Sequence, residues 1–152
     1  MKYSPIKNYI NGKFTDALGD RKMDLVSPID GNALSTVPMS SYKDLDDAVK
    51  AAKKAFETWS RIPIKERVQV FFKYKTLLEK NIQSLAELCS EENGKTIGES
   101  LAEIEKCIEL TEFATSLPQL VSGEVLEVSR GVECRTEHVP LGVVASIVPF
   151  NF

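Results

Sequence analysis

The residue with the clearest potential for chemistry is Asn151, which stands next to Phe152 at the end of the printed sequence. It follows an apolar run from Gly142 to Val148, whose composition is typical of a parallel strand that is buried on both faces. Ligands of open α/β sheets bind beyond the carboxyl ends of the strands, and such a run would place residues 148–151 there. A side-chain amide can donate an N–H to a carbonyl oxygen that gains negative charge, without exchanging a proton itself. Taken alone, an Asn at a strand end is more often a turn residue, so both interpretations stay open at this point.

Thiol and imidazole side chains are the other candidates for chemistry. Cys89 and Cys107 fall on apolar helical stripes, where a thiol behaves as a small hydrophobe, and Cys134 lies in a predicted hairpin with no base nearby. The three cysteines form no CxxC pair, and His138 is the single histidine, so no metal-binding constellation is present in the sequence. We therefore expect no catalytic role for these side chains, and the cysteine usage favours a reducing, cytoplasmic setting.

The composition is typical of a soluble globular protein with room for a core. Of the 152 residues, 43% are hydrophobic and 27% are charged. The 19 basic and 22 acidic residues give a formal net charge of −3, and no basic stripe is interleaved with aromatic residues. We therefore expect no nucleic-acid partner. The polar N-terminus lacks the apolar segment of a signal peptide, and no apolar run approaches the roughly 20 residues that span a bilayer, so we expect no membrane partner either.

The elements that must position the strand tip begin with short strands in residues 1–40. Asn11-Gly12 takes the positive φ angles of a tight turn readily, which predicts a hairpin between the apolar residues on either side. Two further strands, over 23–26 and 33–37, flank a turn cluster at 27–31.

Between residues 41 and 118 the apolar spacing becomes helical and predicts three helical segments. The first segment begins at the capping box Ser41–Asp44. The second begins at Pro63, is interrupted near Asn81 and ends at Asn93-Gly94. The third begins at the capping box Thr96–Glu99 and ends at Pro118.

From Gly123 onward the pattern predicts β structure again. A hairpin is expected over 124–128 and 132–139, followed by the buried parallel strand at 142–148. Because a parallel strand needs neighbouring strands and crossover helices, we expect this chain to be the front part of a larger α/β protein. The expected organisation is residues 1–122 as the first part of a nucleotide-binding domain, 123–140 as an oligomerisation-type hairpin, and 141–152 as the first sheet strand.

The segment PLGVVASIVPFNF, residues 140–152, resembles the P-x-G-V-V-x-x-I-x-P-W/F-N-F motif of the NAD(P)-dependent aldehyde dehydrogenase superfamily. The stretch YINGKF, residues 9–14, is similar to the opening hairpin of that family. The other matches, in the family's order and approximate spacing, are Ser27-Pro28 with Gly31, Ala55-Phe56, Trp59, Arg67 and Glu92-Asn-Gly-Lys95. Phe150 in place of the common Trp, together with NYING at 8–12, resembles the methylmalonate-semialdehyde dehydrogenases, which form a CoA thioester.

This resemblance implies an α/β fold, namely the N-terminal part of an aldehyde dehydrogenase that ends in the first parallel strand of a Rossmann-like sheet. It assigns Asn151 as the catalytic oxyanion donor, and Val148, Pro149 and Phe150 as the lining of the nicotinamide-ribose side of the cofactor site. The implied cofactor is NAD, with NADP as the alternative and CoA as a candidate acyl acceptor, and no metal is implied. The nucleophilic Cys, the activating Glu and the family's own glycine turn should follow residue 152, and the usual G-x-G-x-x-G fingerprint is absent from the sequence.

The same resemblance implies an aldehyde substrate, specifically a semialdehyde, and a homo-oligomer that is bridged by the hairpin near 124–139. The chain by itself is expected to be inactive. The alternative hypothesis is a non-catalytic interaction module that docks onto a full-length homologue. The sequence does not decide the aldehyde, the choice between NAD and NADP, or the use of CoA.

Overall fold

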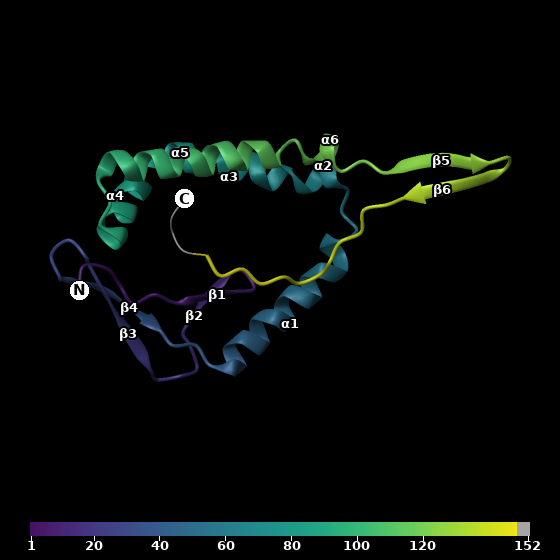
Figure 1. Ribbon diagram of the computed structural model, residues 1–152. Coiled ribbons are helices and arrows are strands. Elements are labelled where there is room, and N and C mark those ends of the chain that lie inside the picture. Colours follow the sequence, from purple (N-terminus) through teal and green to yellow (C-terminus); the bar gives the residue numbers. More distant parts are fainter. Residues whose placement is uncertain (149–152) are drawn as a thin grey trace.

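The computed structural model describes residues 1–148 and consists of three short hairpins and a set of helices (Figure 1). The elements in chain order are β1 (Asn8–Ile10), β2 (Lys13–Thr15), β3 (Lys22–Val26), β4 (Ala33–Pro38), α1 (Tyr42–Trp59), α2 (Ile64–Arg67), α3 (Gln69–Lys80), α4 (Ile82–Asn93), α5 (Ile97–Ala114), α6 (Leu117–Leu120), β5 (Glu124–Ser129) and β6 (Val132–Thr136). Strands β1 and β2, β3 and β4, and β5 and β6 form three separate two-stranded antiparallel sheets. The predicted α/β class, with both helices and strands, is confirmed.

The first hairpin has the turn that its sequence predicts. Asn11 and Gly12 have φ angles of 52° and 76°, as a two-residue turn between twisted antiparallel strands requires. The register places Tyr9 opposite Phe14, and their ring centroids lie 4.9 Å apart. This aromatic pair stabilises a hairpin whose strands are only three residues long.

Both predicted capping boxes are formed at the starts of the two longest helices. Thr96 accepts a hydrogen bond from the backbone N–H of Glu99 (3.3 Å), whose carboxylate accepts one from the Thr96 backbone N–H (3.0 Å). Ser41 and Asp44 form the same arrangement at α1. Each box satisfies backbone donors that the first turn of a helix leaves unbonded.

The predicted break and end of the second helical segment are also confirmed. Asn81 leaves the helical conformation between α3 and α4, and its side-chain amide donates to the Leu77 carbonyl at 2.7 Å. Gly94 follows α4 with a φ of 85°, and a Cβ at this position would lie 3.1 Å from the Pro28 side chain. Both facts require glycine here, because an L side chain is disfavoured at this φ and the space is already occupied.

The buried core lies where α5 packs against α3 and α4, with a smaller part at β4. Its buried apolar members are Leu34, Val68, Leu78, Ala86, Cys89 and Ile104. Ala86 and Ser100 are fully buried, which indicates a close approach of α4 and α5 at small side chains.

Pro118 has a different role from the predicted one. Helix α5 ends at Ala114, and Pro118 lies in the first turn of α6. A proline is tolerated there because the N–H it lacks would have no partner within the helix. In the last hairpin the turn is Arg130-Gly131, with a Gly131 φ of 72°, and β6 ends at Thr136 instead of at Val139.

Residues 142–148, predicted as a buried parallel strand, are not assigned to any strand. Ile147 is 99% exposed and Val148 is 75% exposed. A strand requires a hydrogen-bonded neighbour, and the described part of the chain offers this segment no parallel partner. The apolar composition therefore does not lead to burial within these residues.

The elements form an open frame. Figure 1 shows α1 set apart from the layer of α3 and α5, while the β5–β6 hairpin projects away from the rest. The apolar stripe of α1 is largely uncovered, with Leu45 61% exposed and Trp59 43% exposed. The accessible surface is 11,899 Å², whereas a self-contained monomer of 16.9 kDa exposes about 7,700 Å². The excess of about 4,200 Å² means that this fold presents much apolar surface that is normally covered in a compact domain.

Candidate functional site

The predicted catalytic and cofactor residues fall mostly beyond the described part of the chain. Asn151, Pro149 and Phe150 lie outside residues 1–148, so their positions stay predictions. Val148 is described, and it belongs to the segment after β6, which returns from the projecting hairpin (Figure 1). Its apolar side chain is exposed and can therefore contact a ligand or another element.

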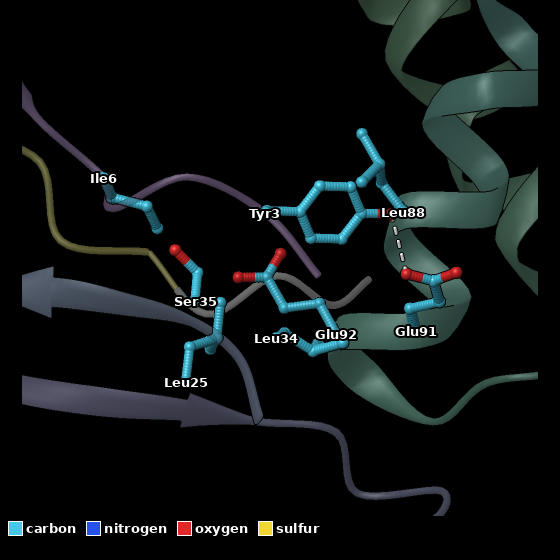
Figure 2. A pocket seen from close by; sticks show the side chains of 8 residues that line it. All are labelled: Tyr3, Ile6, Leu25, Leu34, Ser35, Leu88, Glu91 and Glu92. Atoms are coloured by element: carbon cyan, nitrogen blue, oxygen red, sulfur yellow. Dashed lines mark hydrogen bonds between the residues drawn. The ribbon is translucent and has the colours of Figure 1, made fainter. Parts of the chain in front are cut away.

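A first cavity lies between the N-terminal segment, the β3–β4 hairpin and α4 (Figure 2). One wall of the cavity is formed by residues 1–7, which run beside β4. The Tyr3 N–H donates to the Leu34 carbonyl at 2.8 Å, and the Ile6 N–H donates to the Thr36 carbonyl at 2.9 Å. The hydroxyl of Ser35, which is 2% exposed, donates to the Ser4 carbonyl at 2.7 Å. These bonds fix the segment that lines one side of the cavity.

The rim of this cavity carries a carboxylate with two donors. The Tyr3 hydroxyl donates to Glu91 at 2.8 Å (Figure 2). The Lys2 ammonium forms an ion pair with the same carboxylate. Hydrogen bonds from Lys2 and then Tyr3 lower the pKa of Glu91, and the hydrogen bond to Glu91 raises the pKa of Tyr3. Glu91 is therefore a structural acceptor that holds the N-terminal segment to α4 and is poorly suited to act as a base.

The interior of this cavity is small and mainly apolar. It has a volume of about 180 Å³. The lining residues are Tyr3, Ile6, Leu25, Leu34, Ser35, Leu88, Glu91 and Glu92. They include no thiol or imidazole, and the hydroxyls of Ser35 and Tyr3 donate hydrogen bonds to the Ser4 carbonyl and to Glu91.

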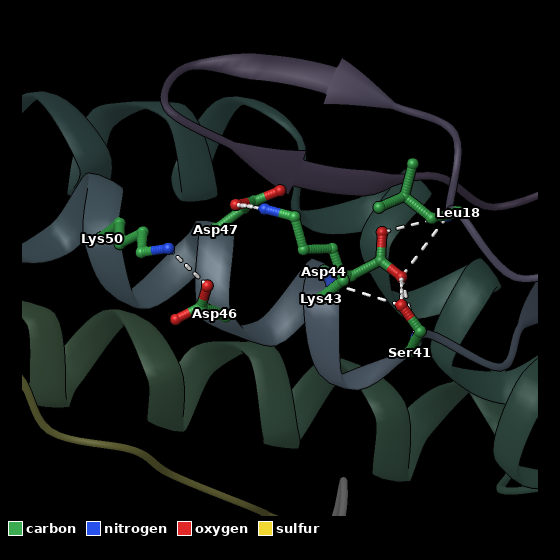
Figure 3. Close-up of polar contacts among 7 residues, drawn as sticks. All are labelled: Leu18, Ser41, Lys43, Asp44, Asp46, Asp47 and Lys50. Carbon is green, nitrogen blue, oxygen red and sulfur yellow. Dashed lines mark hydrogen bonds and ion pairs between the residues drawn. The ribbon is translucent and has the colours of Figure 1, made fainter.

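A second polar cluster lies at the start of α1 (Figure 3). The Asp44 carboxylate accepts hydrogen bonds from the Ser41 backbone N–H (2.8 Å), the Ser41 hydroxyl (2.7 Å) and the Leu18 N–H (3.1 Å). The bonds from the Ser41 hydroxyl and backbone, followed by that from Leu18, lower the pKa of Asp44, although burial opposes them. This carboxylate joins the loop after β2 to α1, and its acceptor capacity is used by the fold.

Exposed ion pairs complete the polar face of α1. Lys43 pairs with Asp47 at 2.5 Å, and Lys50 pairs with Asp46 at 2.6 Å, each across one helical turn (Figure 3). The bond from Lys50 lowers the pKa of Asp46. Such surface pairs contribute little to stability, and they mark this face of α1 as solvent-facing.

The three cysteines lie in different environments. Cys89 is buried between helices, and Cys134 is exposed on β6. Burial, and then the nearby Glu103 and Cys89, raise the pKa of Cys107, which lowers its thiolate fraction at neutral pH. Among residues 1–148, no three His, Cys, Asp or Glu side chains are placed to hold a metal ion. Within the same range, no helix is long and apolar enough to cross a membrane.

One polar pair was not foreseen from the sequence. Lys95 forms an ion pair with Glu103, and both side chains are largely shielded from solvent, at 19% and 7% exposed. The Ser90 hydroxyl donates to the Lys95 carbonyl at 2.7 Å, so the turn between α4 and α5 is fixed at two points. The only sequence signal is the eight-residue separation, which places the lysine before α5 and the glutamate two turns into it.

Comparison with known proteins gives the family. Residues 14–152 match the family model described as "Aldehyde dehydrogenase family". The chain belongs to the aldehyde dehydrogenase family. The recognition made from residues 9–14 and 140–152 is therefore confirmed.

Individual aldehyde dehydrogenases resemble the chain over nearly its whole length. Malonate-semialdehyde dehydrogenase 1 of Geobacillus kaustophilus is 41% identical over 148 residues, which are 97% of this chain and 30% of that protein. A Sinorhizobium meliloti structure, provisionally named methylmalonate-semialdehyde dehydrogenase and solved with NAD, has a TM-score of 0.93 at 34% identity, over 100% of this chain and 31% of that one. An NAD-dependent benzaldehyde dehydrogenase of Corynebacterium glutamicum has a TM-score of 0.76 at 28% identity, over 81% of this chain and 27% of that one.

The chain thus spans about a third of the length of the aldehyde dehydrogenases it matches. The predicted fold class, the N-terminal part of the aldehyde dehydrogenase fold, is confirmed by this agreement. The TM-score of 0.93 over the whole chain means that the Sinorhizobium meliloti structure shares this arrangement of elements.

Proposed function

We propose that this chain forms the N-terminal part of an enzyme that oxidises malonate semialdehyde or methylmalonate semialdehyde with NAD. The observation that carries the proposal is the difference between structural matches. The TM-score is 0.93 over the whole chain for the Sinorhizobium meliloti structure, but 0.76 over 81% of the chain for the benzaldehyde dehydrogenase. The 41% identity to a malonate-semialdehyde dehydrogenase supports the same substrate class.

In the proposed reaction, Asn151 donates its amide N–H to the aldehyde oxygen when a cysteine thiolate attacks the carbonyl carbon. The donor stabilises the negative charge that develops on that oxygen, and it keeps its proton throughout. NAD, when bound, supplies the hydride acceptor. The attacking cysteine and the glutamate that activates the deacylating group are not assigned to any of the 152 residues, and CoA is the proposed acyl acceptor.

Val148, Pro149 and Phe150 are proposed to line the nicotinamide-ribose side of the cofactor site. Val148 fits this role in the described structure, because it is apolar, exposed and free of any strand pairing. Pro149 fixes its own φ and limits the directions in which the next residues can point. The proposed contribution of this chain is therefore one wall of the cofactor pocket and one oxyanion donor.

A chimera tests this proposal. Residues 1–152 replace the matching 30% of the Geobacillus kaustophilus enzyme, and NAD reduction is followed with malonate semialdehyde, methylmalonate semialdehyde and benzaldehyde. We expect activity with the semialdehydes, a loss of roughly 10²–10³ in kcat for Asn151→Ala, and full activity for Gln119→Ala, a control at an exposed position. A folded chimera that prefers benzaldehyde, or in which Asn151→Ala keeps its rate, contradicts the proposal.

The acyl acceptor is tested in the same chimera. With CoA present we expect an acyl-CoA product by mass spectrometry and faster turnover. Formation of free acid at an unchanged rate would show that water is the acceptor.

We also infer a cytoplasmic homo-oligomer. The cysteines of the described chain are free thiols, which suits a reducing compartment. All residues of β5 and β6 are exposed, so the hairpin is available to a second copy. The same exposure favours the second candidate function, an interaction module that docks onto a full-length homologue. Co-purification of the chain with the intact Geobacillus kaustophilus enzyme, without gain of activity, would support that function.

A further inference from the structure

A second cavity lies at the base of the projecting hairpin. It is formed by the turn before α2, by α2 itself, by the end of α6 and by the residues that flank β5 and β6. Figure 1 shows α2 and α6 next to the point where the hairpin leaves the rest of the chain. The cavity has a volume of about 440 Å³.

The walls of this cavity carry an excess of cationic groups. Arg61 and Arg67 line it together with the imidazole of His138, and Glu137 is the single acidic residue among the described lining residues. The Glu137 carboxylate lies 3.8 Å from the Arg135 guanidinium on the hairpin, so it is already attracted by another cation. Within residues 1–148, Arg61 and Arg67 form no ion pair with a carboxylate. The cavity therefore has an unneutralised positive wall.

One donor on this wall is buried and lacks an acceptor. The Nε–H of Arg67 is shielded from solvent and has no hydrogen-bond partner among the described residues. Buried donors in native proteins are nearly always bonded, so this N–H is available to an acceptor that enters the cavity. The guanidinium presents Nε–H and Nη–H as a planar fork, which matches the two oxygens of a carboxylate.

The rest of the lining restricts the ligand further. Ile62, Ile64 and Val121 give the cavity an apolar side next to its cationic side. A short carbon chain can lie against these side chains while its charged end reaches Arg67. We propose that this cavity binds a carboxylate carried on a short carbon chain, held by the Arg67 guanidinium with Arg61 and His138 beside it. The inference is independent of the proposed aldehyde oxidation.

Butyrate is the probe for the test, and His138 is the reporter, because the chain contains one histidine. Butyrate is titrated into the 152-residue chain at constant ionic strength against chloride, and the imidazole signals are followed by NMR. We expect a saturable shift with butyrate and none with chloride. Arg67→Gln should weaken binding roughly tenfold to a hundredfold, as expected for a lost charged hydrogen bond. Arg130→Gln, at the exposed hairpin turn, removes the same charge and should leave the affinity unchanged.

Arg61→Gln provides a second variant, because Arg61 is exposed and its replacement does not disturb packing. It should weaken butyrate binding several-fold, even if Arg67→Gln fails to fold. The proposal is overturned if butyrate gives no saturable shift. It is equally overturned if folded Arg67→Gln or Arg61→Gln binds as tightly as Arg130→Gln.

A second arm identifies the source of the carboxylate. Sedimentation of the chain is measured with butyrate and with chloride. If the natural occupant is an acidic side chain of a second copy, butyrate should dissociate the assembly, and if it is a soluble acid, sedimentation should stay the same. Either result supports a carboxylate site, provided that the NMR titration shows saturable binding.

Discussion

Replacing Gly123 by alanine tests how the projecting hairpin is anchored. A Cβ at this position would lie 2.4 Å from the carbonyl oxygen of Thr136, whereas carbon–oxygen contacts are normally about 3.3 Å or longer. The two backbones must therefore separate by about 1 Å. Because Glu124 pairs with Thr136 in the ladder, this movement acts on the first pair of β5 and β6.

The expected cost of Gly123→Ala is about 1–3 kcal/mol in the free energy of unfolding, as for other overpacked sites. For a chain of this length, each kcal/mol lowers Tm by roughly 2–4 °C. We expect the loss in thermal unfolding followed by circular dichroism, together with faster amide hydrogen exchange in residues 124–136. Gly98 in α5 has open space around it, so Gly98→Ala is the matched control and should stabilise the chain by up to about 1 kcal/mol. Equal stability of the two variants, or unchanged exchange in the hairpin, would refute the steric argument.

The remaining predictions concern polar contacts and association. Ser41→Ala removes the N-cap of α1 and should lower the free energy of unfolding by about 1 kcal/mol in urea titrations. The pKa of Asp44 is lowered by its hydrogen bonds, so its contribution to the free energy of unfolding is complete above the unfolded pKa of about 3.9 and is lost as pH falls through the folded pKa. The Asp44→Asn variant should lack this loss of stability in acid, which urea midpoints measured against pH would detect. Lys95→Met leaves the buried Glu103 carboxylate unpaired and should cost about 3 kcal/mol, while Lys95→Met with Glu103→Leu should recover most of it. The excess surface of about 4,200 Å² predicts self-association, and a stable, compact monomer in sedimentation would contradict that reasoning.

Local sequence rules were sufficient where a few neighbouring residues determine the backbone. Ser41 with Asp44, Thr96 with Glu99, and Asn11 with Gly12 satisfy backbone donors or adopt turn angles without help from distant segments. The end of α4 at Gly94 has the same local origin, although the contact with Pro28 adds a tertiary reason for glycine.

Apolar composition identifies surfaces suited to burial, but whether they are buried depends on partner elements. Residues 142–148 have the composition of an inner strand, yet they are exposed, because pairing and covering must come from other elements. Leu45 and Trp59 on α1 show the same effect on a helix. Periodicity predicts which face of a helix is apolar, but it does not predict which neighbouring element covers that face.

The polar groups around the two cavities could not be predicted because they join residues that are far apart in the sequence. Tyr3 and Glu91 are 88 positions apart, and Arg67 meets the base of the hairpin about 70 positions later. No spacing rule relates such residues. The predicted site residues 149–151 were recognised through the family motif, and their geometry stays a prediction.

The projecting hairpin has a consequence for how this protein family can diversify. Its strands are solvent-exposed along their whole length and are anchored at the base, so substitutions on them hardly alter the helical core. Selection for a new binding partner can therefore change β5 and β6 while the thermodynamic stability of the scaffold is preserved. Residues that determine partner affinity and residues that determine folding lie in different parts of this structure, so the two properties can evolve at different rates.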